Sequence, residues 1–323
     1  MSVAIGILSS HDDIHAIAVQ QKIAERHPLV RCHVIAGKEL ATKGGLSWSN
    51  DVNAPSVLRT TDDELVEIGH LDAFWYRRLT MHQVLPEEAD PEYAEHIHTS
   101  CWAALQGHLM TQFRGFWVSD PVATELGENK LLQLRAAQRA GLRVPATLVS
   151  QDPSRIRSFC GSHPGAIIKP VRARGELAVT AVASEELLTQ DDVLALAPAI
   201  YQENIPGDRH LRITMFGDRC HAALIEAREL DWRTDVTVPF RAYEPSGPLR
   251  AALQDVLRSL GLVMGIFDLK LTPGGDVVFF EINPQGQFLF VEGLCNMPIA
   301  ASLADYLVER AHEHAATRRA EYV

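Results

Sequence analysis

The segment from residue 265 to residue 283 constrains the fold of this chain more than any other. It reads GIFDLKLT, then the turn PGGD, then VVFFEIN, so two apolar runs flank a glycine-containing turn. This pattern predicts a β-hairpin with strands that are largely buried. Each strand nevertheless carries a carboxylate, Asp268 in the first and Glu281 in the second. Charged residues seldom enter such strands unless they are paired or bind a metal.

The length of the turn predicts how the two carboxylates are placed. If Thr272 faces Val277 across the turn, Asp268 lies directly opposite Glu281, and by alternation Asn283 shares the face of Glu281. Like charges opposite each other destabilise a sheet, and three oxygen ligands without sulfur or imidazole suit Mg²⁺. We therefore predict a magnesium site at Asp268, Glu281 and Asn283. The alternative is that Asp268 or Glu281 pairs with a buried arginine or caps a loop.

Four cationic side chains lie where they could hold phosphate groups. Lys169 ends the apolar run AIIK, and Lys130 begins a predicted helix, whose positive dipole end favours anions. Arg212 follows YQENI on a predicted strand, and Lys270 shares the face of Asp268 by alternation. For Lys130 and Lys169 the alternative is a solvated surface lysine. No GxxxxGKS or GxxxxGKT motif occurs, so the sequence contains no P-loop.

Composition restricts the class of protein. With 323 residues, 46% of them hydrophobic, the chain can bury a core and suits two or three packed subdomains. The net charge of −11, without a long run of Lys or Arg, argues against nucleic acid or an anionic membrane as the main partner. No apolar stretch reaches the length of a membrane span, and the N-terminus lacks signal-peptide features. We expect a cytoplasmic protein.

Helical and strand patterns are mixed along the whole chain. The opening VAIGILSS, HDDIHAIAVQQKIAERH and VRCHVIA predict a βαβ unit. A helix from Lys130 is predicted to have Asn129 as its cap and Gly141 as its stop. Further predictions are a helix over 91–113, a strand over 165–171, three strands within 199–227, a helix over 245–262 and a C-terminal helix. The pattern indicates an α/β or α+β protein.

The order and spacing of these motifs resemble the ATP-grasp superfamily. The matching motifs are Lys130, IIKP, YQENIPG with LRITMFGD, GIFDLK and FFEINPQGQF. More narrowly, FWYRR at 74–78, NKLLQLRAAQRAGLRVPATLVSQDP, LDWR at 230–233, and FEINPQGQFLFVE with MPIAASLADYL resemble the graspetide synthetases, the microviridin-type peptide macrocyclases. The resemblance implies an ATP-grasp fold with a βαβ-type pre-grasp domain at 1–118, a central subdomain at 119–203 and a C-terminal subdomain with the metal site at 204–323.

The resemblance also implies roles for the residues that would bind ATP and Mg²⁺. Gln202 to Ile205 would form the hinge between the two grasping subdomains, with backbone groups of Glu203 and Ile205 reading adenine. Lys130 and Lys169 would hold the α- and β-phosphates. The γ-phosphate would be held by Arg212 and Lys270, which are thereby candidate catalytic residues, and Mg²⁺ by Asp268, Glu281 and Asn283.

The activity implied is ATP-dependent macrocyclisation of a precursor peptide with a leader and an acidic, Thr-rich core. A side-chain carboxylate of the core becomes an acyl phosphate, and a Thr or Ser hydroxyl or a Lys amine attacks it to close an ester or amide ring. A homodimer is the family expectation. One alternative is an intermolecular ligase that adds an amino acid to a peptide or to another amino acid. A nucleotide-binding protein without turnover is disfavoured, because the metal and phosphate residues are all present.

Three arginines are candidates for holding the substrate carboxylate. Arg233 of DWR is favoured for this role and counted among the catalytic candidates, because it follows a strand beside the expected cleft. For Arg77 and Arg78 of FWYRR, a structural ion pair behind a Trp-Tyr core contact is an equal alternative. His210 is given no role, because ATP-grasp ligases often carry an acid at that position. The stretch from 183 to 199 is predicted to form a helical platform for the leader, or else an ordinary solvated helix.

Overall fold

The computed structural model describes residues 3–51, 54–78, 82–172, 181–229, 232 and 237–321. Contacts between Cα atoms divide the chain into two compact units. The first unit contains Met1–Thr124, Leu262–Met264 and Gln285–Val323, and the second contains Glu125–Gly261 and Gly265–Pro284. Both ends of the chain therefore belong to the first unit.

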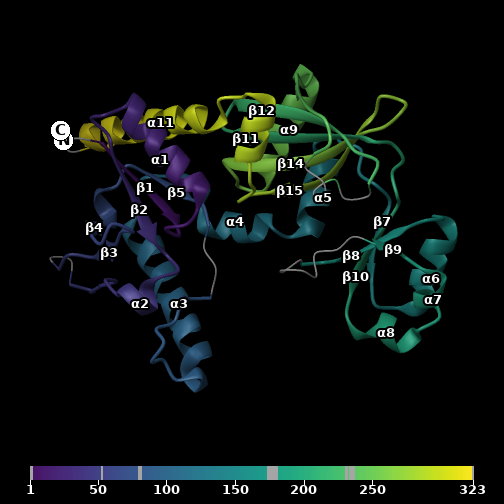
Figure 1. Ribbon diagram of the computed structural model, residues 1–323, viewed down its shortest axis with the longest axis horizontal. Coiled ribbons are helices and arrows are strands. Elements are labelled where there is room, and N and C mark those ends of the chain that lie inside the picture. Colours follow the sequence, from purple (N-terminus) through teal and green to yellow (C-terminus); the bar gives the residue numbers. More distant parts are fainter. Residues whose placement is uncertain are drawn as a thin grey trace. The chain divides into compact units, whose positions relative to one another are not determined.

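The first unit is built on a parallel sheet of order β2-β1-β5-β6. The chain enters it through β1, α1 and β2, which confirms the βαβ unit predicted from the sequence (Figure 1). Its elements are β1 (Ala4–Ser9), α1 (Ile14–Arg26), β2 (Arg31–Ala36), α2 (Leu40–Lys43), β3 (Val57–Arg59), β4 (Leu65–Glu67), η1 (Ile68–His70), β5 (Ala73–Tyr76), η2 (Pro91–Tyr93), α3 (Ala94–Gln112), β6 (Phe116–Val118), α10 (Leu289–Cys295) and α11 (Ile299–Glu321).

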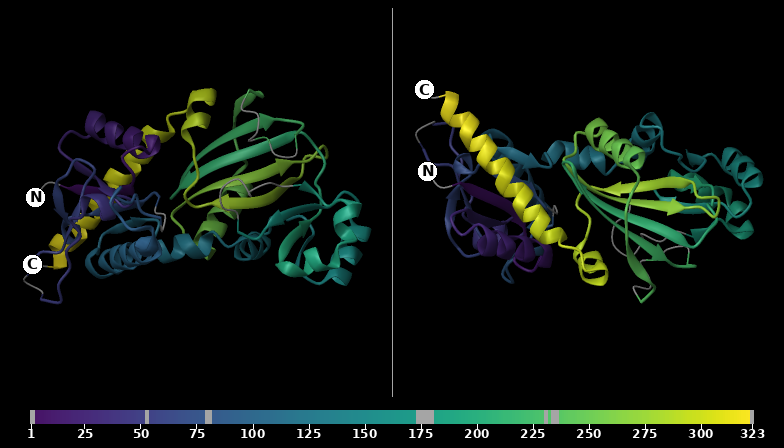
Figure 2. Two further views of the ribbon diagram at one scale, coloured as in Figure 1. Left: turned by 60° about the horizontal axis from the view of Figure 1, so that its bottom comes forward. Right: turned by 90° about the horizontal axis from the view of Figure 1, so that it is seen from above.

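The C-terminal helix α11 packs on this parallel sheet. It contacts α1, β1, β5 and β6, and Figure 2 shows it as a long yellow helix against the purple N-terminal elements. Ile299, Leu303, Leu307 and Ala311 recur every four residues and are fully buried, so one apolar stripe drives the packing. This stripe joins the last part of the predicted range 204–323 to the first unit. The three-domain division itself stays a prediction.

A buried polar network joins the start of α1 to the start of α10. Asp13 caps α1 by accepting from the N–H of His15, and it also accepts from the hydroxyl of Ser9 at 2.7 Å. Nε2 of His15 accepts from the backbone N–H groups of Phe288 at 3.0 Å and Leu289 at 3.3 Å. Only a neutral imidazole has this acceptor. Burial lowers the pKa of His15, which keeps the ring neutral.

The second unit contains two antiparallel sheets, of order β7-β10-β8-β9 and β13-β12-β11-β14-β15. Helices α6, α7 and α8 cover the smaller sheet, where Ile156, Leu194 and Tyr201 share one apolar cluster. The larger sheet carries α9, because Leu257 of this helix lies against Gly265 of β14. The elements are α5 (Lys130–Arg139), β7 (Thr147–Ser150), α6 (Pro153–Ser162), β8 (Ile167–Pro170), β9 (Ala181–Val182), α7 (Glu185–Leu188), α8 (Asp191–Leu196), β10 (Ala199–Gln202), β11 (Arg209–Phe216), β12 (Arg219–Glu226), β13 (Phe240–Tyr243), α9 (Gly247–Ser259), β14 (Met264–Leu271) and β15 (Val277–Asn283), while α4 (Pro121–Gly127) crosses the boundary between the units.

Most predicted elements of this unit are present with shifted ends. Helix α5 has Asn129 as its cap, accepting from the N–H groups of Leu131 and Leu132, and Gly141 follows it with φ of 79°. The platform predicted between 183 and 199 consists of two short helices, α7 and α8, that expose Glu185, Glu186, Asp191 and Asp192. Leader binding there stays a prediction.

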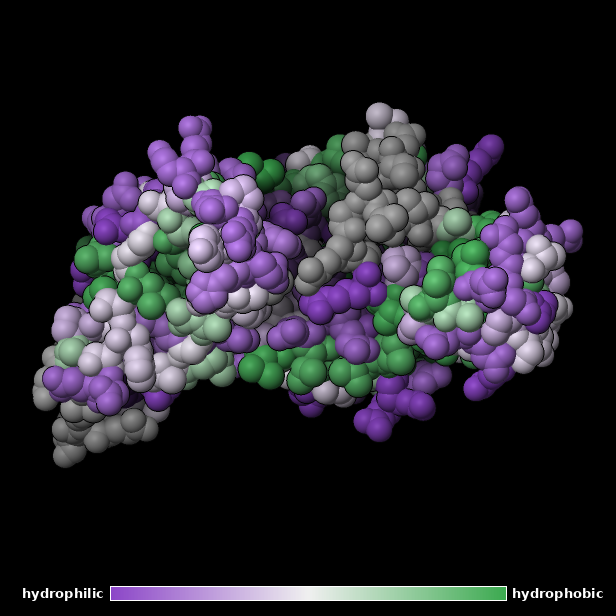
Figure 3. Space-filling view, turned by 90° about the horizontal axis from the view of Figure 1, so that it is seen from below, coloured by the Kyte–Doolittle hydropathy of each residue, from purple (hydrophilic) through white to green (hydrophobic). Residues whose placement is uncertain are grey.

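The face of the molecule seen from below is mostly hydrophilic with scattered apolar patches (Figure 3). The exposed apolar residues of the protein include Leu131 and Leu132 of α5. Among the described helices, none combines the length and apolar character needed to cross a bilayer. The five cysteines are all free.

The neutral state of His15 predicts how the stability of the protein depends on pH. Its pKa is lowered in the folded state, so its contribution to the free energy of unfolding is complete above about pH 6.5 and is lost as the pH falls below that value. The nearby Arg77 charge acts in the same direction as burial, and the Asp13 carboxylate acts against both.

The variant His15→Gln keeps an acceptor for the α10 N–H groups but does not titrate. Between about pH 8 and about pH 5, the melting temperature of the wild type should fall more steeply than that of the variant. Thermal melts of both proteins across this range measure the difference. Equal slopes would contradict this assignment for His15.

Candidate active site

The β14–β15 hairpin places two carboxylates opposite each other, as predicted. Asp268 pairs with Glu281 in the antiparallel register. The predicted pairing of Thr272 with Val277 is wrong, because Val277 pairs with Leu271. A β-bulge shifts the register by one residue between Leu269 and Asp268. Because of this shift, Asp268 pairs with Glu281 even though the predicted pairing at the turn is wrong.

The bulge decides which face of the sheet Glu281 occupies. Phe279 pairs with Leu269 and is fully buried, and Phe280 is the extra residue before Glu281. In a strand with strict alternation, Glu281 would share the buried face of Phe279. The extra residue instead turns Glu281 and Asn283 to the face that lines a pocket.

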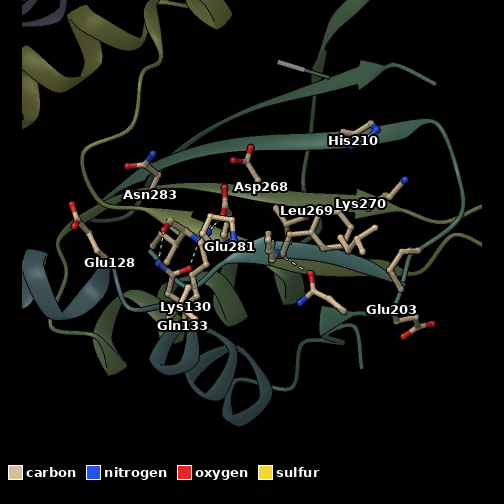
Figure 4. A pocket seen from close by; sticks show the side chains of 18 of the residues that line it. Glu128, Lys130, Gln133, Glu203, His210, Asp268, Leu269, Lys270, Glu281 and Asn283 are labelled. Atoms are coloured by element: carbon tan, nitrogen blue, oxygen red, sulfur yellow. Dashed lines mark hydrogen bonds and ion pairs between the residues drawn. The ribbon is translucent and has the colours of Figure 1, made fainter. Parts of the chain in front are cut away.

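This pocket, of about 310 Å³, lies within the second unit. It is lined by residues of α5, β8, β10, β14 and β15 and of the segment after β10 (Figure 4). The structure therefore brings together residues that are far apart in the sequence. The predicted nucleotide and metal residues among its lining are Lys130, Lys169, Gln202, Glu203, Ile205, Asp268, Lys270, Glu281 and Asn283. Arg233 lies outside the described residues, so its predicted roles in catalysis and substrate binding stay predictions.

Each of the two opposed carboxylates has a cationic partner in this structure. Nη1 of Arg212 lies 2.8 and 2.9 Å from the two carboxylate oxygens of Asp268, and Nζ of Lys130 forms an ion pair with Glu281. The guanidinium of Arg212 also stacks on Trp232, 5.5 Å from the ring centroid. The ion pair with a buried arginine, considered above as an alternative for Asp268, is thus present.

The donor set nevertheless fits a magnesium ion. Two carboxylates and an amide supply hard oxygen donors, and Mg²⁺ usually completes its shell with water and substrate phosphates. Within the described ranges, no cluster of three or more His, Cys, Asp or Glu side chains could hold a metal alone. Binding at Asp268, Glu281 and Asn283 would therefore need Arg212 and Lys130 to move from carboxylates to phosphates. The metal role stays a prediction.

A chain of hydrogen bonds fixes Lys169 at the pocket. The hydroxyl of Thr147 donates to Pro145 O at 2.8 Å, so its oxygen accepts from Nε2 of Gln202, also at 2.8 Å. This orients the amide of Gln202, whose Oε1 accepts from Nζ of Lys169 at 2.9 Å. The ammonium of Lys169 is thereby held on β8 beside the other cations.

Lys270 differs from the other pocket cations. Its side chain is buried on β14, and no described residue forms a hydrogen bond or ion pair with its ammonium group. Burial lowers the pKa of Lys270, and the charge of Asp208 opposes this shift. A buried cation without a hydrogen bond is costly, so this position is suited to an anionic ligand.

The segment after β10 connects this strand to β11. Its first residue, Glu203, is hydrogen-bonded to Ala146, which directly precedes β7. The N–H of Glu203 donates to Ala146 O at 2.9 Å, and its side chain accepts from the N–H of Ala146 at 3.0 Å. If Glu203 reads adenine through its backbone, the carbonyl is the group available, because the N–H is already bonded to Ala146. The adenine-reading role of Glu203 and Ile205 stays a prediction.

The pocket lining includes residues to which sequence reasoning gave no role, among them Gln133, His210 and Trp232. Gln133 is one of several polar residues on α5, and no motif distinguished it. Trp232 directly precedes Arg233 in the motif LDWR, so this motif was the sequence signal that could have identified it. His210 is buried, and its Nε2 lies 3.3 Å from Ala227 O.

The two arginines of FWYRR have different surroundings in the first unit. Arg77 is only 1% exposed, its Nε lies 3.3 Å from Asp13, and its Nη1 donates to Gln285 O. Burial lowers its pKa to about 10, against the attraction of Asp13. Arg77 thus forms the structural ion pair considered as the alternative. Arg78 is exposed. The substrate role stays a prediction for both.

No protein-family model matches this chain, and no curated protein matches it. Solved structures do match. Macrocyclase MdnC from Microcystis aeruginosa MRC, bound with precursor peptide MdnA, has a TM-score of 0.86 and 24% identity over 95% of this chain and 100% of that chain. A Chryseobacterium gregarium RiPP-associated ATP-grasp ligase, in complex with ADP and a leader and core peptide, has a TM-score of 0.84 and 23% identity over 95% of this chain and 97% of that one.

The chain has the ATP-grasp fold. The VanG D-Ala:D-Ser ligase from Enterococcus faecalis also matches, with a TM-score of 0.59 and 16% identity over 96% of this chain and all of that one. These comparisons confirm the predicted fold class over nearly the whole chain.

Replacing Lys270, whose ammonium group has no hydrogen bond or ion pair among the described residues, should separate ligand binding from stability. In Lys270→Met the melting temperature of the ligand-free protein should stay level or rise, because a buried charge is removed. ATP affinity should fall about 10- to 100-fold, the loss expected for one charged hydrogen bond, while ADP affinity changes little. Titrations of both nucleotides measure this, with Lys22→Met, at a half-buried lysine of α1 in the first unit, as control. Equal losses for ATP and ADP would contradict a γ-phosphate role.

The two arginines of FWYRR should respond differently to substitution. Arg77→Met leaves Asp13 buried without its cation and should lower the free energy of unfolding by about 3–5 kcal/mol. Arg78→Ala should change it by less than about 0.5 kcal/mol, as is usual for an exposed residue. Chemical denaturation measures both values. A stable Arg77→Met protein would contradict the structural role of Arg77.

Proposed function

We propose that this protein is an ATP-dependent ligase that macrocyclises a ribosomally made precursor peptide. The observation that carries the proposal is the pocket of the second unit. There Lys130, Lys169 and Lys270 converge with the opposed carboxylates Asp268 and Glu281 on an ATP-grasp fold. Cations beside hard oxygen donors are the groups needed to hold and polarise the phosphates of a nucleotide with its metal ion.

The reaction activates a carboxylate that is otherwise a poor electrophile. An oxygen of a substrate Asp or Glu side chain attacks the γ-phosphorus of ATP, ADP leaves, and an acyl phosphate forms. A Thr or Ser hydroxyl or a Lys amine of the same peptide then attacks the carbonyl carbon. Phosphate leaves, the attacking group loses its proton, and an ester or amide ring is closed.

In the proposal this work is divided among residues that line the pocket, Arg212, which contacts the pocket residue Asp268, and Arg233. Lys130 and Lys169 hold the α- and β-phosphates, and Arg212 and Lys270 neutralise the charge that develops on the transferred group. A Mg²⁺ ion held by Asp268, Glu281 and Asn283 would supply further charge neutralisation as a Lewis acid. Arg233 completes the proposal by aligning the substrate carboxylate.

The choice of a peptide substrate is supported by the structural neighbours. MdnC is a macrocyclase bound with a precursor peptide, and the ATP-grasp ligase PsnB was solved with a minimal precursor, Mg and ADP. We extend precursor binding, Mg²⁺ use and ADP formation to this chain as part of the proposal. A cytoplasmic homodimer that recognises the leader with α7 and α8 belongs to it as well.

The second candidate is an intermolecular ligase that joins an amino acid to a peptide or to another amino acid. Its support is the likeness to the VanG D-Ala:D-Ser ligase. That likeness is weaker than the likeness to the peptide-bound enzymes, with TM-scores of 0.59 and 0.86 for VanG and MdnC. The nucleotide pocket is compatible with both reactions, so the product must decide between them.

Intact-mass spectrometry of a candidate precursor tests the proposal. The peptide, encoded by a short reading frame beside the gene, is incubated with the protein, ATP and Mg²⁺, and a Glu281→Gln variant serves as control. The expected result is the loss of one water mass per ring with the wild type alone. Addition of an amino acid to the peptide, or ATP consumption with an unchanged peptide, would overturn the macrocyclase assignment.

A further inference from the structure

Strand β15 lies at the edge of its sheet, and groups from and just after helix α5 form hydrogen bonds with its outer side. The sheet order β13-β12-β11-β14-β15 leaves one side of β15 without a neighbouring strand. Two groups from and just after α5 take the place of that neighbour. The carbonyl of Arg143 accepts from the N–H of Phe279 at 2.8 Å, and the side chain of Gln133 bonds to Ile282. The bulge residue Phe280 lies between these two anchors.

The carboxamide of Gln133 imitates the peptide group of a missing strand. Its Oε1 accepts from the N–H of Ile282 at 3.2 Å, and its Nε2 donates to the C=O of the same residue at 2.8 Å. Nε2 also donates to Gly127 O, at the end of α4, at 2.7 Å. The Gln133 side chain is buried at 2% exposure, and three hydrogen bonds satisfy both polar atoms.

The residue that Gln133 holds lies between two predicted metal ligands. Ile282 is flanked by Glu281 and Asn283, which reach the pocket face only because of the bulge. Lys130, the ion-pair partner of Glu281, lies one helical turn before Gln133 on α5. The side chain of Gln133 therefore connects α5, which carries the proposed phosphate-binding Lys130, to β15, which carries two of the predicted metal ligands.

We propose that Gln133 is a positioning residue that locks β15 in its bulged register. The proposal deepens the nucleotide function proposed above and rests on it for the consequence at the pocket. Strand β15 pairs with a strand on one side only, and a slip by one residue would move its side chains to the opposite face of the sheet. In the slipped register Glu281 would face the α9 side, so the hydrogen bonds of Gln133 to Ile282 select the register with Glu281 in the pocket.

Hydrogen exchange tests how firmly Gln133 anchors β15 at Ile282, and it needs no ligand. In Gln133→Leu, which fills the space without hydrogen bonds, the backbone N–H of Ile282 should exchange at least about tenfold faster, while β14 keeps its protection. Gln138→Leu, at an exposed glutamine of the same helix, should change neither. Val256→Ala in the core of α9 provides a variant with a general loss of stability and an intact anchor.

Binding of Mn²⁺ with ADP, followed by electron paramagnetic resonance, tests the consequence at the pocket. Gln133→Leu should bind this pair about tenfold more weakly than Val256→Ala under conditions of equal fraction folded. Gln133→Glu provides a rescue, since a protonated carboxyl can both donate to and accept from Ile282. Its affinity relative to the wild type should therefore recover as the pH is lowered, whereas that of Gln133→Leu should not.

The outcomes separate this inference from the proposed function. Faster exchange at Ile282 with weaker Mn²⁺–ADP binding supports the positioning role. Exchange and binding equal to those of Val256→Ala would overturn it, because Gln133 would then contribute stability alone. If the wild type does not bind Mn²⁺ with ADP, the nucleotide assignment fails, and the exchange experiment still decides whether Gln133 anchors β15 at Ile282. If it binds them but closes no ring, only the macrocyclase assignment fails.

Discussion

The opposition of Asp268 and Glu281 on neighbouring strands is the constraint on which the rest of the site depends. Two carboxylates facing each other across a hairpin repel, so each needs a cation. In this structure Arg212 and Lys130 supply those cations from β11 and α5. The same two side chains are the ones proposed to hold phosphates. The ligand-free pocket is therefore held together by ion pairs that a bound nucleotide and metal would have to replace.

Under the proposed function, such an exchange of partners would make the pocket selective for a nucleotide together with its metal ion. A metal ion alone would have to compete with Arg212 and Lys130 for the two carboxylates. A nucleotide that brings its own phosphates gives these cations new partners at the same time. Lys270 stands apart, because its burial without a hydrogen bond among the described residues already favours an anion. The binding of nucleotide and metal is expected to be mutually dependent, as linkage requires.

Much of the fold and of the pocket was predictable from local patterns. Alternating apolar residues and a glycine turn predicted the β14–β15 hairpin, and Asn129 correctly predicted the start of α5. The pairing of Asp268 with Glu281 was predicted correctly from a wrong register near the turn. The error arose because a bulge inserts Phe280 without any marker such as glycine or proline in the sequence. Gln133 was missed for a related reason, since its partner is a backbone group 149 residues away.

The sequence by itself determined an α/β or α+β fold through apolar periodicity and turn chemistry, which are local properties. The ATP-grasp fold and the types of residue at its pocket were implied by the resemblance of motifs whose order and spacing the sequence also contains. The tertiary structure decided which alternative applies to each charged group. It made Arg77 a buried partner of Asp13, gave Asp268 and Glu281 their cations, and set the register of β15 through Gln133. Such choices depend on distances between groups remote in the chain, and a pattern of neighbouring residues does not contain them.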